Sequence, residues 1–143
     1  MCESNITFSY NGVEAGFFNE GDLSDCLHQV ALQENKTIEH LHYVLCTDDF
    51  LLDLNRRFLQ HDTLTDILTF PECYRPVVAE IYISLTRVKE NAILHSQGHF
   101  IEEFQRVVLH GLLHMFEYGD ATPEEKSLMR ARENHYLRML QRH

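Results

Sequence analysis

The sequence lacks long apolar runs, a recognisable export signal and closely spaced cysteines. Its longest apolar runs are far too short to cross a bilayer, and residues 1–12 do not place a basic patch before an apolar stretch, as a signal peptide requires. The four cysteines are scattered singly, so they form no Cys-x-x-Cys pair of the kind found in structural zinc sites and redox motifs. Because no export signal is recognisable, we expect reduced thiols and a cytoplasmic protein that does not contact the membrane.

An excess of basic residues is also missing, since the net charge is −10. Non-specific binding to nucleic acid depends on clustered Lys and Arg that contact phosphates, so this charge balance argues against it. Net charge, however, does not say where the charges lie. Basic residues in the middle of the chain could form one positive face on an acidic body: Arg56, Arg57, Arg75, Arg87, Lys89 and Arg106.

The chain contains no repeat, linker or low-complexity segment, and its 143 residues suit one domain spanning 1–143 with a real hydrophobic core. Alternating polar and apolar residues predict strands, and apolar residues at helical spacing predict helices. Strands are expected over residues 6–10, 37–46, 67–70 and 79–84, with Pro71 stopping the third. Helices are expected over residues 22–34, after 47 or 48, after 84 to near 98, over 100–118, and from Pro123 onward behind a Thr122 cap with Glu125 at its third position. About four strands and five helices in mixed order predict an α+β domain.

The most strongly helical stretch, residues 100–118, carries two histidines at a spacing that suits a metal ion. Residues four apart project from the same helix face, so His110 and His114 can present two imidazoles to one ion. Gly119 is expected to end the helix with left-handed backbone, after which the chain can bring Asp120 back as a third ligand. Two histidines and one carboxylate leave a position for water, which predicts a catalytic site for one divalent metal, zinc by preference.

Other interpretations of these residues stay open. A His-x-x-x-His pair in a chain with ten histidines is also a common surface or core coincidence. Gly111 costs a helix interior about 1 kcal/mol relative to Ala, which indicates that something there needs close backbone approach. In zinc proteases the residue after the first His is a Glu base, and Gly111 in that position makes a metalloprotease the weaker hypothesis. Glu117, three residues after His114, is a candidate fourth ligand or catalytic base if the helix persists that far, and otherwise a solvated helix-end charge.

Three stretches resemble blocks of a known family. Leu54-Asn55 followed by residues 62–71 is similar to a Leu-Asn…Asp-x-Pro-Thr-Asp-Val-Leu-Ser-Phe-Pro block. Residues 79–84 followed by Arg87 resemble a Gly-Asp-Ile-x-Ile-Ser strand and its continuation. The segment from His110 to His114 matches the start of a His-Gly-x-Leu-His-x-x-Gly-Tyr-Asp-His metal motif. The combination, over about residues 40–137, resembles the YbeY family of bacterial endoribonucleases that act in ribosomal RNA maturation.

This resemblance implies a fold, an activity and partners. The fold would be α+β with a small mixed sheet, and the activity a zinc-dependent endoribonuclease specific for single strands. The substrate would be the 3′ end of small-subunit ribosomal RNA, with the ribosome or a ribosomal protein as partner. The runner-up hypothesis is a non-catalytic ribosome-assembly factor that binds RNA and uses its metal only for structure.

The chain departs from the family pattern at positions that matter. Asp120 stands where the family has its third His ligand, and Glu117 stands where the family has Gly. A family Arg that serves catalysis falls on Leu59, so Arg57, or its neighbour Arg56, is the candidate catalytic substitute. Together with Arg87 and Lys89, these two arginines are expected to line one groove that faces RNA.

Overall fold

The computed structural model describes residues 5–59, 65–95 and 97–141. Along the chain it contains β1 Ile6–Asn11, α1 Glu20–Gln33, β2 Ile38–Cys46, α2 Asp48–Leu54, a π-helical turn η1 Asn55–Leu59, β3 Ile67–Tyr74, β4 Val77–Ser84, α3 Leu85–His95, α4 Phe100–Met115 and α5 Pro123–Leu140. Five α-helices and four strands among the described residues confirm the predicted α+β class. No described helix combines the length and apolar character needed to span a membrane.

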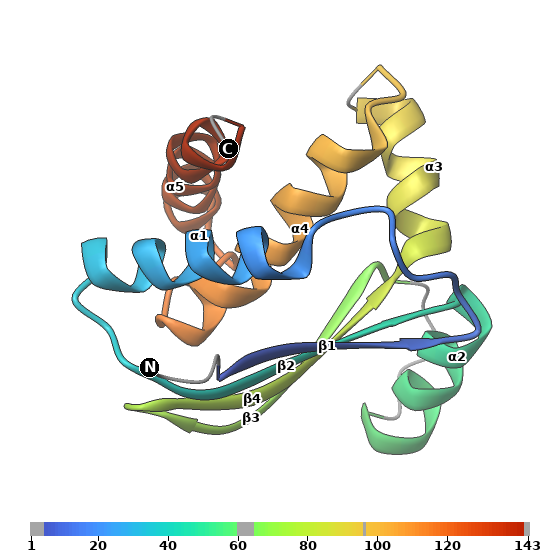
Figure 1. Ribbon diagram of the computed structural model, residues 1–143, viewed down its shortest axis with the longest axis horizontal. Coiled ribbons are helices and arrows are strands. Elements are labelled where there is room, and N and C mark those ends of the chain that lie inside the picture. Colours follow the sequence, from blue (N-terminus) through green and yellow to red (C-terminus); the bar gives the residue numbers. More distant parts are fainter. Residues whose placement is uncertain (1–4, 60–64, 96, 142–143) are drawn as a thin grey trace.

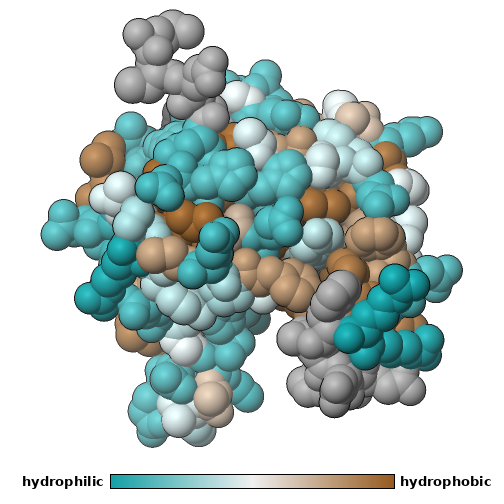
Figure 2. Space-filling model, turned by 90° about the horizontal axis from the view of Figure 1, so that it is seen from below, coloured by the Kyte–Doolittle hydropathy of each residue, from teal (hydrophilic) through white to brown (hydrophobic). Residues whose placement is uncertain are grey.

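The four strands form one mixed sheet in the order β1-β2-β4-β3. The pairs β1–β2 and β2–β4 are parallel, and β3 runs antiparallel to β4 at the edge. Figure 1 shows α1, α3, α4 and α5 on one side of this sheet and α2 beyond the other side, near one end. Seen from the side of the sheet away from the four helices, the surface mixes hydrophilic and hydrophobic residues (Figure 2).

Strand β3 is longer than predicted, because it continues past Pro71 to Tyr74. Proline has no N–H to donate to a sheet, so a central strand would end there. Among the described strands β3 pairs only with β4, and its register shifts between Pro71 and Cys73. An edge strand with an irregularity at this point tolerates the missing donor, which is why the predicted stop at Pro71 was wrong.

The core lies between the sheet and the four helices that cover it. Alternation along β2 places Leu41, Tyr43 and Leu45 in this core, and all three are fully buried. Helix α4 is the central helix, and Tyr43 donates a hydrogen bond of 3.1 Å from its Oη to the backbone carbonyl of Val108. The strand and the helix that carries the two histidines are therefore fixed to one another through buried contacts.

At Gly111, helix α4 lies close to the sheet. A Cβ atom built at this position would lie 2.9 Å from Cδ1 of Ile67 and 3.1 Å from Cδ1 of Ile81. Ordinary carbon contacts are longer than this, so the absence of a side chain brings this turn of the helix close to β3 and β4. The close backbone approach predicted from the Gly is confirmed.

Helix α4 ends earlier than predicted, at Met115, and a different residue adopts the left-handed conformation. Glu117, not Gly119, has a positive φ of 73°. The N–H of Glu117 bonds to the carbonyl of His114 at 2.9 Å, and that of Tyr118 bonds to Leu113 at 3.1 Å. This pair of bonds is the Schellman ending of a helix, which the prediction placed at Gly119 because glycine is its usual residue.

Gly119 and the start of α5 together fix the loop after α4. Thr122 accepts a hydrogen bond from the N–H of Glu125, and Glu125 accepts one from the N–H of Thr122, which confirms the predicted capping box. The carboxylate of Glu125 also accepts from the N–H of Ala121 at 3.2 Å. A Cβ at Gly119 would overlap this carboxylate, so glycine is needed for close approach rather than for a left-handed backbone.

Candidate metal centre

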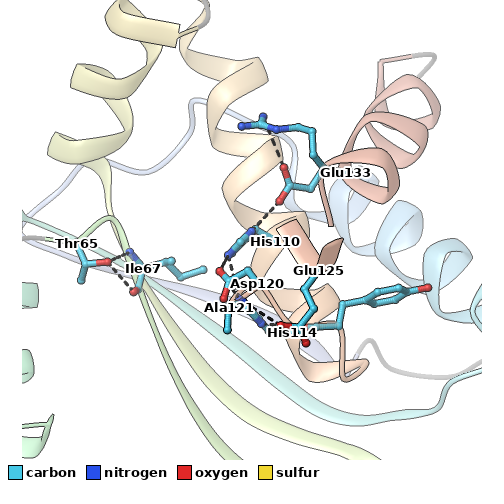
Figure 3. Close-up of polar contacts among 10 residues, drawn as sticks. Thr65, Ile67, His110, His114, Asp120, Ala121, Glu125 and Glu133 are labelled. Carbon is cyan, nitrogen blue, oxygen red and sulfur yellow. Dashed lines mark hydrogen bonds and ion pairs between the residues drawn. The ribbon is translucent and has the colours of Figure 1, made fainter. Parts of the chain in front are cut away.

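His110, His114 and Asp120 meet at the C-terminal end of α4. The two imidazoles come from successive turns of the helix, and Asp120 comes from the loop that precedes α5 (Figure 3). The Nε2 atoms of His110 and His114 lie 3.0 Å apart. Oδ2 of Asp120 lies 3.3 Å from Nε2 of His114 and 3.4 Å from Nε2 of His110. The structure therefore brings together the three residues predicted as ligands, as a group that could hold a metal ion.

The spacing of these three atoms fits one tetrahedral coordination sphere. Zinc binds imidazole nitrogen and carboxylate oxygen at about 2.0–2.2 Å, so two ligand atoms at neighbouring corners of a tetrahedron lie about 3.3 Å apart. The three observed distances are 3.0, 3.3 and 3.4 Å. Two nitrogens and one oxygen suit zinc and other transition ions better than magnesium or calcium, which prefer oxygen alone.

Each histidine is held by a second hydrogen bond on its other ring nitrogen. Nδ1 of His110 lies 2.7 Å from Oε2 of Glu133, and Nδ1 of His114 lies 2.9 Å from the backbone carbonyl of Tyr118. Both partners accept, so each Nδ1 carries the proton and each Nε2 lone pair is free for a metal. This arrangement of acceptors behind metal-binding histidines sets both tautomer and ring orientation.

Glu133 is the functional residue that the sequence analysis missed. It lies on α5, is 4% exposed, and its Oε1 accepts a hydrogen bond of 3.1 Å from Nη1 of Arg106. The available signal was its position on the apolar face of α5, four residues after Met129 and three before Tyr136, both of which are buried. A charged residue at such a position requires a partner, because burial of an unpaired carboxylate is costly.

The electrostatics of the site follow from burial and these contacts. Burial would raise the pKa of Glu133, but its hydrogen bond and charge interaction with His110 and its hydrogen bond from Arg106 outweigh burial and lower that pKa. Burial would lower the pKa of His110, but Glu133 and then Asp120 outweigh it and raise that pKa. For Asp66, which lies beside the site, burial prevails and raises the carboxyl pKa.

Glu117, a candidate fourth ligand or base, is engaged elsewhere. Its Oε2 lies 2.6 Å from the guanidinium of Arg75, in the turn between β3 and β4, and 3.9 Å from Nζ of Lys36. The helix does not persist to Glu117, as that hypothesis required. The carboxylate of Glu117 therefore pairs with two cations rather than joining the three candidate ligands.

Two arginines of the predicted basic groove have acidic partners. Arg57 lies on η1, is 69% exposed at its side chain and pairs with Asp53. Arg87 pairs with Asp48 and with Glu90. The block that carries the family resemblance includes residues 60–64, which lie outside the described residues, as does the side chain of Leu59.

Two open hollows meet at the candidate ligands, and Asp66, Ile67, His110 and Asp120 line both. The first, of about 370 Å³, extends between α4 and α5 and carries three cations: Arg106, Lys126 and Arg130. The second, of about 480 Å³, extends along the edge strand β3 and is lined by these further residues: Thr65, Thr69, Pro71, Tyr74, His114 and Met115. Among the described residues that line these two hollows, none belongs to the predicted groove of Arg56, Arg57, Arg87 and Lys89.

The fold and the three converging donors define a small α+β protein with a candidate metal centre among its described residues. A family model described as Endoribonuclease YbeY matches residues 17–141. The chain belongs to the YbeY family, as its sequence blocks indicated.

Individual relatives agree with this assignment over nearly the whole chain. A protein named Endoribonuclease YbeY from Cytophaga hutchinsonii is 39% identical over 137 residues, which cover 94% of each chain. Its namesake from Amoebophilus asiaticus is 37% identical over 139 residues, covering 96% of this chain and 94% of the relative. A Thermotoga maritima protein solved in solution superposes with a TM-score of 0.68 at 28% identity, covering 93% of this chain and 88% of that one.

Proposed function

We propose that this protein is a metal-dependent endoribonuclease that cleaves single-stranded RNA. The observation that carries the proposal is the open group of His110, His114 and Asp120 at the junction of two hollows, in a chain whose relatives are named endoribonucleases. A divalent ion held by these three residues, zinc by preference, would supply Lewis-acid chemistry for phosphodiester hydrolysis. The remaining steps belong to the residues around it.

The protein's own residues orient the ligands and the substrate. Glu133 and the carbonyl of Tyr118 fix the two imidazoles, so that the ligand atoms keep their positions when substrate binds. The hollow along β3 offers hydroxyls and the ring of Tyr74, which is 45% exposed and suits stacking against an unpaired base. A single strand that crosses the ligands can therefore place its bases on one side and its phosphates on the other.

Two cations of the first hollow, Lys126 and Arg130, are the proposed phosphate contacts. Lys126 and Arg130 lie four residues apart on α5, so their side chains leave the same face of the helix, and both residues are exposed. Arg106 is only 18% exposed at its side chain and is bonded to Glu133, which suits support of the site better than contact with a mobile strand. Four carboxylates also line this hollow, so the proposed phosphate contacts rest on these two exposed side chains and not on a positive surface: Asp66, Glu103, Asp120 and Glu133.

The finer assignment follows the family resemblance. We extend the proposal to the 3′ end of small-subunit ribosomal RNA as substrate, the ribosome or a ribosomal protein as partner, and the cytoplasm as location. The alternative of an assembly factor with a structural metal requires a closed coordination sphere, for which Glu117 is the candidate. Its ion pairs with Arg75 and Lys36 weigh against that alternative, and Gly111 in place of a Glu base weighs against a protease.

Metal analysis paired with an RNA cleavage assay tests this proposal. Protein purified without a metal-binding tag should hold close to one ion per chain and cleave a labelled single-stranded oligoribonucleotide. The double variant His110→Ala, His114→Ala should lose both properties, whereas His28→Ala, His40→Ala should keep both. Full metal content and cleavage in the first variant would refute the proposed centre.

A second experiment tests the phosphate contacts. Lys126→Glu, Arg130→Glu should weaken RNA binding and reduce the slope of log affinity against log salt by about 0.7 for each phosphate that is no longer neutralised, the value for single strands. The matched charge reversal Arg56→Glu, Arg57→Glu should change neither quantity if the hollow between α4 and α5 is the binding surface. The opposite pattern would assign the phosphates to the groove first predicted from the sequence.

A further inference from the structure

The carboxylate of Glu34 accepts hydrogen bonds from two tyrosine hydroxyls that come from distant parts of the chain. Glu34 caps the C-terminus of α1, and its side chain is 9% exposed. Tyr118, from the loop after α4, donates to Oε1 at 2.6 Å, and Tyr136, from α5, donates to Oε2. Glu34 is 84 residues from Tyr118 in sequence and is not among the residues that line the two hollows beside the ligands.

Tyr118 connects this carboxylate to the candidate metal centre. Its backbone carbonyl accepts the hydrogen bond from Nδ1 of His114, and its N–H bonds to the carbonyl of Leu113. It also stands two residues before Asp120 in the same loop. The position of Tyr118 therefore sets both the acceptor that orients His114 and the start of the segment that delivers Asp120.

The Glu125 carboxylate holds the loop after Asp120, at Ala121 and Thr122, whereas the part before Asp120 has weaker contacts besides Tyr118. Glu117 holds a left-handed backbone that a non-glycine residue adopts only where its surroundings impose it. Its ion pairs with Arg75 and Lys36 join partly or largely exposed side chains, and such pairs contribute little. A hydrogen bond from Tyr118 to a nearly buried carboxylate is stronger, since its acceptor is charged and shielded from water.

We propose that Glu34 is a positioning residue for the metal centre, acting through Tyr118 on His114 and Asp120. The proposal rests on the metal site assigned above but not on the cleavage of RNA. It differs from a purely structural role, in which Glu34 would only join α1 to α5 through Tyr136. The two hydrogen bonds of the same carboxylate separate these roles, because one leads to the metal loop and the other to the helix beside it.

The test compares Tyr118→Phe with Tyr136→Phe. Each variant keeps its ring and backbone and loses one hydroxyl that donates to Glu34, so both should lower the melting temperature of the metal-free protein. Residues that orient metal ligands typically change affinity 10–100-fold, and an effect relayed through one more residue should lie near the lower end. We expect Tyr118→Phe to weaken Zn²⁺ affinity by about 10-fold in competition with a chromophoric chelator. Tyr136→Phe should keep it within about twofold, because the buried ring still holds α5 in place.

Two further variants complete the test. Glu34→Ala should reduce Zn²⁺ affinity as Tyr118→Phe does and should change the absorption spectrum of the Co²⁺-loaded protein, because the ligand geometry is less fixed. Glu34→Gln, which keeps an acceptor oxygen for Tyr118, should recover part of the affinity. Equal losses in Tyr118→Phe and Tyr136→Phe, or no loss in either, would overturn the proposal. Neither outcome depends on RNA, so it can be told apart from a failure of the proposed nuclease activity.

Discussion

Replacing Glu133 by Gln should weaken metal binding without removing a ligand. The carboxylate accepts from Nδ1 of His110 at 2.7 Å and from Arg106 at 3.1 Å, one bond on each oxygen. An amide has a single acceptor oxygen. If that oxygen faces Arg106, the NH₂ group faces His110 and favours the tautomer with its proton on Nε2, which cannot bind a metal. If the amide is reversed, its NH₂ group faces the guanidinium instead.

The expected size of this effect is a 10–100-fold loss of Zn²⁺ affinity, or about 1.4–2.7 kcal/mol. A chelator competition measures it directly, and at saturating zinc the metal-induced stabilisation should fall by the same amount. Glu103→Gln is the matched control, since Glu103 is a buried carboxylate that lines the same hollow on α4. Wild-type affinity in Glu133→Gln, or an equal loss in Glu103→Gln, would refute the role of the His110–Glu133 bond.

Substitutions at three other positions have defined outcomes. Asp120→His should retain metal and shift the rising limb of the cleavage pH profile to lower pH, because a neutral ligand leaves the ion a stronger Lewis acid; Asp120→Ala should lose metal on dialysis. Gly111→Ala should lower the melting temperature, since crowding of Ile67 and Ile81 costs about 1–3 kcal/mol and the gain in helix propensity offsets only about 1 kcal/mol. Asp66 has a raised pKa when folded, so its ionised form destabilises the metal-free protein above that pKa. Asp66→Asn should therefore be more stable than wild type in urea at pH 7, and this difference should shrink as the pH falls towards the ordinary carboxyl range; a constant difference would contradict the argument.

The parts of the site that could be predicted are those set by local geometry. Helical spacing alone places His110 and His114 on one face of α4. The loop between α4 and α5 is short, so Asp120 has to lie near the two histidines. Gly111 also had a local signal, because glycine is unfavourable inside a helix unless close packing requires it. The strands and helices followed for the same reason, since their apolar periodicities are properties of neighbouring residues.

What could not be predicted depends on contacts between distant segments. Glu133 reaches His110 from 23 residues away, and the packing of α5 against α4 decides that contact. The groove of Arg56, Arg57, Arg87 and Lys89 stays a prediction, and net charge and sequence proximity did not reveal that Arg57 and Arg87 have acidic partners. The left-handed residue at the end of α4 was predicted at Gly119, because glycine is its usual residue. The hydrogen bonds of the helix end earlier, so Glu117 adopts this conformation instead.

The departures from the family's metal motif lie together in the loop that carries the third ligand. An aspartate side chain is shorter than that of a histidine, so its backbone has to lie closer to the two imidazoles to place a ligand atom at the same distance. Gly119, next to Asp120, permits this approach because a side chain there would overlap the Glu125 carboxylate of the capping box. The same sequence no longer has glycine at the end of α4, and Glu117 takes the left-handed position with Arg75 and Lys36 as partners. The loop therefore depends on contacts from outside α4, and Tyr118 with Glu34 is the best buried of these.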